Sequence, residues 1–296
     1  MKFGIGIANY GETLSVERMR SVAVEAERLH FESIWTTDHI LMPRQSGTPY
    51  ERIFDSIASL AYLASVTQEP KLGISALIIA MRNPIVAAKQ LSSIDEFAGG
   101  GRLILAMAAG WNEKEFSFLG GEYHRRGKRL NESIRLFRDL WRGHTSFHSE
   151  IIKANFDDAV FQPRPATGQI PIWIGGTSQA AMKRAADLGD GWHPNVLPMN
   201  TFKKLVEQFR QVSPNAKNKD ICVRIGLNTK ASNSEYVGPT GERRILLSGN
   251  MLENHGIVEE LEKLGVSTAI VVPSPDGKIS TEGQIQSIRT FAQEFL

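Results

Sequence analysis

"PIWIGGTSQAAMKRAADLGDGW" spans residues 171–192 and decides the fold of this chain. Residues 170–175 form an apolar run with the length of a buried strand, and residues 178–189 repeat small and apolar side chains at helical spacing. A Gly-Trp step at 191–192 begins the next apolar segment. The stretch therefore predicts a strand, a helix and the start of another strand, with only two glycines and two hydroxyl residues at the first junction.

The same alternation continues on both sides of this stretch. Strand-like runs occupy residues 3–8, 32–37, 71–80, 102–109, 222–230 and 267–273. Helical periods follow at residues 15–29, 55–67, 84–98, 128–143, 200–212, 256–265 and 281–296. Strict alternation favours a parallel sheet covered by helices, and about eight such pairs in one chain favour a closed (β/α)8 barrel.

An open, doubly wound sheet is the alternative arrangement. The glycine fingerprint of that fold is absent from the first strand and turn, "GIGIANYGETL" at residues 4–14. Residues 144–168 contain prolines but no helical period, which predicts an irregular insertion. We expect the whole chain, residues 1–296, to form a single barrel domain.

Composition excludes several classes of protein. The 296 residues are 42% hydrophobic and 22% charged, with a formal net charge of +2 and no basic tract, so nucleic-acid binding is not expected. Cys222 is the only cysteine, which rules out a disulfide within the chain and is typical of a small buried side chain. The apolar segment at 75–81 is too short to cross a bilayer. We therefore expect a cytoplasmic protein.

The junction at Gly175, Gly176, Thr177 and Ser178 has the features of an anion site. A helix that begins here leaves backbone N–H groups unpaired, and its dipole favours a negative charge. Glycines allow a ligand to approach the backbone closely, and the hydroxyls add donors. The residues therefore favour a phosphate seat at the end of a barrel strand, although an ordinary capped helix after a tight turn has the same local sequence.

Other strand ends carry further candidate residues. Asp38 and His39 follow the second strand. An imidazole at this position is able to transfer a proton near neutral pH; the alternative is a histidine at the rim that only forms a hydrogen bond with a neighbouring residue. Gly110, Trp111 and Asn112 follow the fourth strand. The chain has no HExxH motif and no paired cysteines, so no metal site is expected. A GxSxG elbow is also absent, which argues against a serine hydrolase.

Three motifs in a fixed order carry a family resemblance. They are "GWNEKEFSFLG" (110–120), "RRGKRLNESIRLFRDLW" (125–141) and the stretch at 171–192. This series resembles the bacterial luciferase-like superfamily, and it is most similar to the branch of coenzyme F420-dependent oxidoreductases. The similarity runs from Phe3 to about Trp192 and is one of pattern only beyond it. It implies a TIM barrel of the luciferase-like type that holds one flavin or deazaflavin.

The resemblance also implies a position for the cofactor. The loop from Gly175 to Ser178 would contact its phosphate, in agreement with the local sequence. Ser75 and Ala76 would form a non-proline cis peptide in a bulge of the third strand, beneath the ring.

The resemblance implies roles for two further groups of residues. Asp38 would contact the ring, and His39 would transfer a proton during catalysis. Gly110, Trp111 and Asn112 would lie near the edge of the ring.

Three functions remain open at the level of sequence. The first is hydride transfer between coenzyme F420 and a small organic substrate. A cluster of basic residues would bind the acidic tail of this cofactor; the alternative is that these residues lie on two solvent-exposed helix faces. The cluster consists of Arg125, Arg126, Lys128, Arg129, Lys183 and Arg184. The second is an FMN-dependent monooxygenase supplied by a separate flavin reductase, and the third is a barrel that binds a phosphorylated ligand without redox chemistry. The resemblance implies a homodimer.

Overall fold

A computed structural model describes all residues, 1–296, and its centre is a closed barrel of eight parallel strands. Pairing between β8 and β9 closes the ring. The predicted (β/α)8 barrel is therefore confirmed, and the open sheet is excluded. The barrel strands are β1 (Lys2–Gly6), β2 (Ser33–Thr36), β3 (Lys71–Leu77), β4 (Leu103–Met107), β7 (Ile172–Gly175), β8 (Gly191–His193), β9 (Asp220–Leu227) and β12 (Thr268–Val272).

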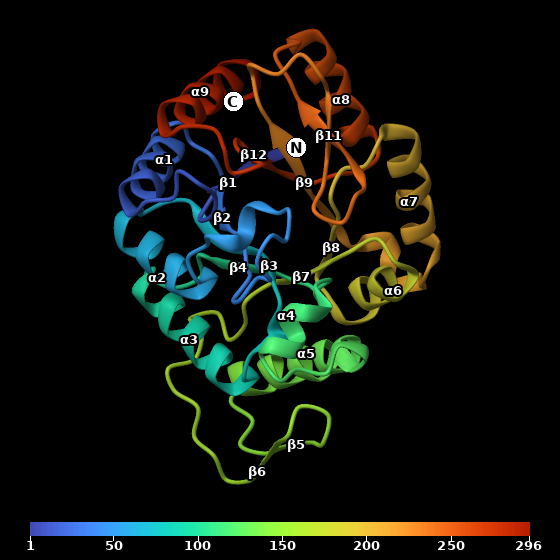
Figure 1. Ribbon diagram of the computed structural model, residues 1–296. Helices are drawn as coiled ribbons and strands as arrows, with labels where there is room; N and C mark the ends of the chain where they lie inside the picture. The colour runs from blue at the N-terminus through green and yellow to red at the C-terminus, as the bar shows by residue number, and fades with distance from the viewer.

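Helices surround the barrel, and the last helix packs beside the first in this outer ring (Figure 1). The outer helices are α1 (Val16–Arg28), α2 (Ser56–Val66), α3 (Pro84–Phe97), α5 (Arg126–Arg142), α6 (Gln179–Leu188), α7 (Met199–Gln211), α8 (Met251–Lys263) and α9 (Thr281–Phe295). Polar side chains fix where these helices begin. Ser15, Asp55 and Ser178, for example, each accept a hydrogen bond from a backbone N–H of the first turn.

Two tryptophans fill the inside of the barrel. Trp35 and Trp173 stack with ring centroids 5.6 Å apart, and both are buried. Glycines on neighbouring strands leave room for them, because a Cβ at Gly73 would overlap the Trp35 ring and one at Gly191 would overlap Trp173. The packed interior closes the lower part of the barrel, so that any ligand must bind above it, at the carboxyl ends of the strands.

Two segments depart from regular alternation. The expected insertion after α5 contains a small antiparallel hairpin, β5 (Phe147–Ser149) and β6 (Ala154–Phe156), which projects at the bottom of Figure 1. Before the helix predicted at residues 256–265, a second hairpin forms from β10 (Glu235–Val237) and β11 (Arg243–Leu247), which the sequence did not predict, and α8 already begins at Met251. β11 continues the sheet beside β9.

A short helix, α4 (Glu113–Phe118), was not expected from the sequence. Asn112 caps it by accepting a hydrogen bond from the Glu115 backbone N–H. No helix of the chain has the length and apolar composition needed to cross a membrane.

Candidate active site

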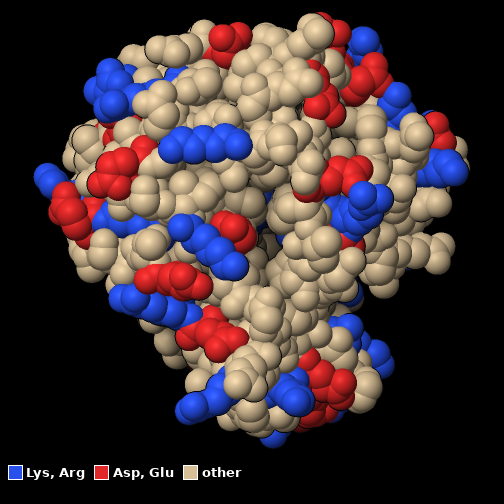
Figure 2. All heavy atoms as spheres, turned by 45° about the horizontal axis from the view of Figure 1, so that its top comes forward, with Lys and Arg blue, Asp and Glu red and all other residues tan.

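A cavity of about 660 Å³ opens at the carboxyl ends of the barrel strands. Figure 2 shows a hollow near the middle of one face, with basic and acidic side chains interspersed around it. The cavity brings together ten of the eleven candidate residues, namely Asp38, His39, Ser75, Ala76, Gly110, Trp111, Gly175, Gly176, Thr177 and Ser178. Asn112 is not part of the lining and instead caps α4.

The predicted anion seat has free donors in the structure. Ser178 Oγ accepts from the Ala181 N–H at 3.2 Å, whereas the backbone N–H groups of Thr177 and Ser178 make no hydrogen bond within the chain. The loop is held from behind, because Trp192 Nε1 donates to the carbonyl of Gly176 at 2.7 Å. Gly176 has φ of +113°, which favours glycine. The loop is therefore fixed with its donors open to the cavity.

Small residues make a floor next to this seat. The Ser75–Ala76 peptide is cis, as expected, and the pairing of β3 with β4 shifts its register here. A Cβ added at Gly175 would lie 3.3 Å from the Ala108 side chain and 3.6 Å from that of Ala76, so these three positions meet. Such a surface accepts a flat group that larger side chains would exclude.

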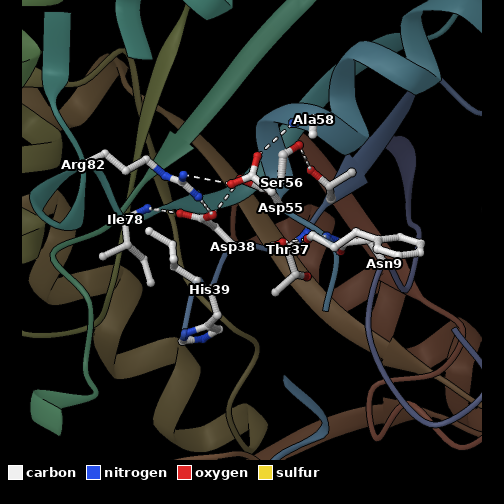
Figure 3. Close-up of polar contacts among 12 residues, drawn as sticks. Asn9, Thr37, Asp38, His39, Asp55, Ser56, Ala58, Ile78 and Arg82 are labelled. Carbon is white, nitrogen blue, oxygen red and sulfur yellow. Dashed lines mark hydrogen bonds and ion pairs between the residues drawn. The ribbon is translucent and has the colours of Figure 1, made fainter. Parts of the chain in front are cut away.

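Asp38 belongs to a network of hydrogen bonds at the cavity wall (Figure 3). One carboxylate oxygen accepts from Ser56 Oγ at 2.7 Å and from Arg82, and the other accepts from the Ile78 N–H at 2.8 Å. Arg82 also pairs with Asp55 at 2.9 Å. Both oxygens of Asp38 are thus engaged within the protein, and the residue holds the β2 and β3 ends together.

His39 points away from this network into the cavity (Figure 3). Its Nδ1 lies 2.7 Å from Glu115 Oε2, and both side chains are buried. The imidazole stacks on Tyr50 at 4.7 Å and meets the edge of Trp111 at 5.6 Å. Because Nε2 makes no hydrogen bond within the chain, it is the nitrogen available to a bound molecule.

Glu115 is the partner that orients His39. It was not among the candidate residues predicted from the sequence, and it reaches His39 from α4. Burial raises the pKa of Glu115, but the hydrogen bond and charge of His39 and the N–H groups of Ile40 and Leu41 outweigh burial and leave the pKa below its usual range. The ionised carboxylate favours a proton on Nδ1, which leaves the lone pair of the neutral ring at Nε2.

A second histidine lies beneath the cis peptide. His193 Nδ1 donates to the carbonyl of Cys222 at 2.8 Å, and its Nε2 is 2.7 Å from Ser75 Oγ. Burial lowers the pKa of His193 to about 4, against a weaker opposing effect of the Cys222 carbonyl. The neutral ring accepts from the serine hydroxyl and so supports the floor of the cavity.

The basic cluster divides between the cavity and the surface. Arg126 and Arg184 belong to the lining of the cavity. Arg129, by contrast, donates to backbone carbonyls, and Lys183 pairs with Asp187 at 2.7 Å on the surface. Only part of the cluster is therefore placed to meet a ligand.

The sequence reasoning missed a further arginine of the lining, Arg224 on β9. Its signal was a single charge within the apolar run at 221–227. Alternate side chains of a barrel strand face inward, so a charge in such a run indicates either the interior or its mouth.

The sequence also matches a known family. A profile of the luciferase-like monooxygenases aligns with residues 1–237. The chain belongs to the luciferase-like monooxygenase family. The predicted family is thereby confirmed. β9 lies near the end of the matched region and β12 lies beyond it, and both complete the same barrel.

Characterised relatives differ in the cofactor that their names record. An FMNH2-dependent dimethylsulfone monooxygenase of Pseudomonas putida is 30% identical over 72% of this chain and 57% of its own length. An F420-dependent glucose-6-phosphate dehydrogenase of Nakamurella multipartita is 31% identical over 61% of this chain and 52% of its own length. The chain thus spans a little more than half the length of these relatives.

Solved structures show the same fold over the whole chain. An F420-dependent secondary alcohol dehydrogenase in complex with an F420-acetone adduct superposes with a TM-score of 0.76. The match covers 97% of this chain and 98% of the other at 15% identity, so it is a likeness of architecture alone.

Proposed function

We propose that this chain is a cofactor-dependent oxidoreductase that transfers a hydride between coenzyme F420 and a small organic substrate. The observation that carries the proposal is the cavity, in which unpaired N–H groups of Thr177 and Ser178 lie beside a floor of small residues at Gly175, Ala76 and Ala108. A phosphorylated cofactor with a flat ring fits this combination of an anion seat and a low floor.

Each group of residues has a task in binding. The N–H groups of Thr177 and Ser178 would hold the phosphate, and Arg184 of the same helix adds a positive charge to that side of the cavity. Ala76 and Gly175 would support the ring, and Trp111 would lie at its edge. When bound, the deazaflavin supplies or accepts the hydride, which no side chain can do.

His39 would move the accompanying proton. Its Nε2 is free in the cavity, and Glu115 fixes the ring through Nδ1. In the direction of oxidation the neutral imidazole takes a proton from a substrate hydroxyl or amine, and the Glu115 carboxylate stabilises the charge that forms. In the direction of reduction the protonated ring returns it.

Direct titration tests the proposal. The purified protein is titrated with coenzyme F420 and, separately, with FMN, and binding is followed by the quenching of cofactor fluorescence. We expect the deazaflavin to bind more tightly. Turnover of the reduced cofactor against enones, imines and alcohols then identifies the substrate class. Binding of FMN alone would overturn the choice of cofactor, and binding of a phosphosugar with neither cofactor would indicate a barrel without redox chemistry.

A second candidate is an FMN-dependent monooxygenase that receives reduced flavin from a separate reductase. The relative from Pseudomonas putida, with its FMNH2-dependent name, favours it. The same seat and floor serve either ring system. The product distinguishes the two functions, because a monooxygenase places one atom of ¹⁸O₂ in the product and a hydride-transfer enzyme places none. We further propose a homodimer, which sedimentation analysis would show as twice the mass of 32.8 kDa.

A further inference from the structure

Arg224 crosses the mouth of the barrel and binds only neutral groups. From β9 its Nη1 donates to the carbonyl of Ser75 at 2.7 Å and to Thr37 Oγ1 at 3.1 Å. Its Nη2 donates to the hydroxyl of Tyr10 at 3.4 Å. These three partners come from the ends of β1, β2 and β3, so the guanidinium is held in one place above the packed interior.

No carboxylate of the chain pairs with this guanidinium. The cavity lining contains two carboxylates, and each is already matched: Asp38 with Arg82, and Glu242 with Arg244. Arg224 forms no ion pair with either. Arg224 is half-buried, and a partly desolvated charge without a counter-charge is well suited to an anionic ligand.

Part of the guanidinium remains open to a ligand. Nε and the second N–H of Nη2 make no hydrogen bond within the chain, and Nε of Arg224 is not among the buried atoms that lack a partner. These two N–H groups form one edge of the planar fork, which matches two oxygens of a carboxylate or sulfonate.

Arg224 also stands between two cavities. It lines the cavity described above and a neighbouring cavity of about 740 Å³, and Tyr50 and Arg244 share this position. Tyr50 stacks on His39 at 4.7 Å, so one wall carries both the unpaired cation and the support of the candidate proton carrier. A ligand bound at Arg224 therefore lies on the same wall as the support of His39.

The phosphate of a cofactor has its own seat on another strand. That seat follows β7, and its backbone N–H groups at Thr177 and Ser178 are the donors there. The charge of Arg224 is thus left for a second ligand. Taking the proposed function as given, we infer that the substrate is an organic anion whose carboxylate or sulfonate pairs with Arg224 while its reacting carbon faces His39.

The experiment compares two probes of equal chain length, hexanesulfonate and hexanol. Each is titrated into the protein saturated with whichever cofactor binds, and the change in the absorption spectrum of the bound cofactor reports binding. We expect hexanesulfonate to bind at least about tenfold more tightly, because a charge-assisted pair is worth more than a neutral hydrogen bond. Arg224→Gln should reduce the preference to less than about twofold, and Arg224→Lys should retain part of it.

Lys183→Gln is the matched control, since it removes one positive charge from the exposed surface of α6. It should leave the preference for the sulfonate unchanged. Cofactor affinity is measured for every variant, and circular dichroism checks that each variant folds. The comparison of probes in the unmodified protein decides the question even if Arg224→Gln does not fold.

The outcomes separate this inference from the proposed function. Failure of both cofactors to bind contradicts the proposed function. If a cofactor binds and the unmodified protein does not prefer the sulfonate, the inference alone is wrong. It is also wrong if hexanesulfonate displaces the cofactor, because the anion then occupies the phosphate seat, or if Arg224→Gln weakens cofactor binding and leaves the sulfonate preference intact.

Discussion

Glu115 Oε2 lies 2.7 Å from Nδ1 of His39, and the other oxygen of Glu115 accepts the N–H groups of Ile40 and Leu41. The carboxylate therefore fixes the imidazole and also the backbone that follows it. Its charge stabilises a protonated ring, and its position leaves Nε2 for the substrate. This pair makes His39 a more specific candidate than its position at a strand end indicates.

Glu115→Gln tests the pair. The amide removes the negative charge and offers an N–H to Nδ1, which favours the wrong tautomer of the ring. We expect kcat to fall by about a hundredfold or more, in the range of a lost general base, with a much smaller change in KM. An unchanged kcat would remove Glu115 from the catalytic arrangement.

Thr177→Glu tests the phosphate seat. A carboxylate at the start of α6 would repel a phosphate and occupy its place, so cofactor affinity should fall by at least about a hundredfold. Thr201→Glu is the matched control, because Thr201 is an exposed threonine in the first turn of α7. Fluorescence titration of both variants measures the difference. Retained affinity in Thr177→Glu would show that the cofactor phosphate binds elsewhere.

The sequence predicted the barrel because its strands and helices carry their own local signals. Apolar runs such as residues 103–107 indicate buried strands, and Asn83 with Pro84 marks the start of α3. The hairpin of β10 and β11 has no such signal, because its strands are short and only partly buried. Its pairing depends on β9, which is a tertiary contact.

The candidate site was predictable only where it follows strand ends. Gly175–Ser178 and His39 stand directly after strands, so the barrel rule located them. Glu115 and Arg224 act across the mouth, and their partners are 76 and 149 residues away in the chain, at His39 and Ser75. Such pairs are set by strand order and side-chain direction, which one sequence does not display.

His193 predicts a pH dependence of stability. Its pKa is about 4 in the folded protein and has the ordinary value of 6.5 in the unfolded chain. Between these two pH values the unfolded chain binds a proton at His193 that the folded chain does not bind. Above about pH 6.5 His193 is neutral in both states and does not change the free energy of unfolding. As the pH falls from 6.5 towards 4, the free energy of unfolding decreases. His193→Gln removes the difference. We expect the unmodified protein to lose about 2 kcal/mol more than the variant between pH 7 and 4.5, measured by urea unfolding. Parallel curves for the two proteins would contradict a neutral buried His193.

Gly73→Ala tests the packing that closes the lower barrel. The added methyl group would overlap the buried ring of Trp35, which is itself stacked on Trp173, so neither indole has space to retreat. We expect a loss of about 1–3 kcal/mol in the free energy of unfolding, as for other overpacked cores.

Gly256→Ala is the control, because Gly256 lies within α8 and a Cβ there would meet nothing within 4 Å. That variant should gain about 0.5–1 kcal/mol from helix propensity. Urea unfolding of both variants at pH 7 measures the two changes in the free energy of unfolding. If Gly73→Ala is as stable as the unmodified protein, the interior of the barrel is less tightly packed than the two stacked indoles indicate.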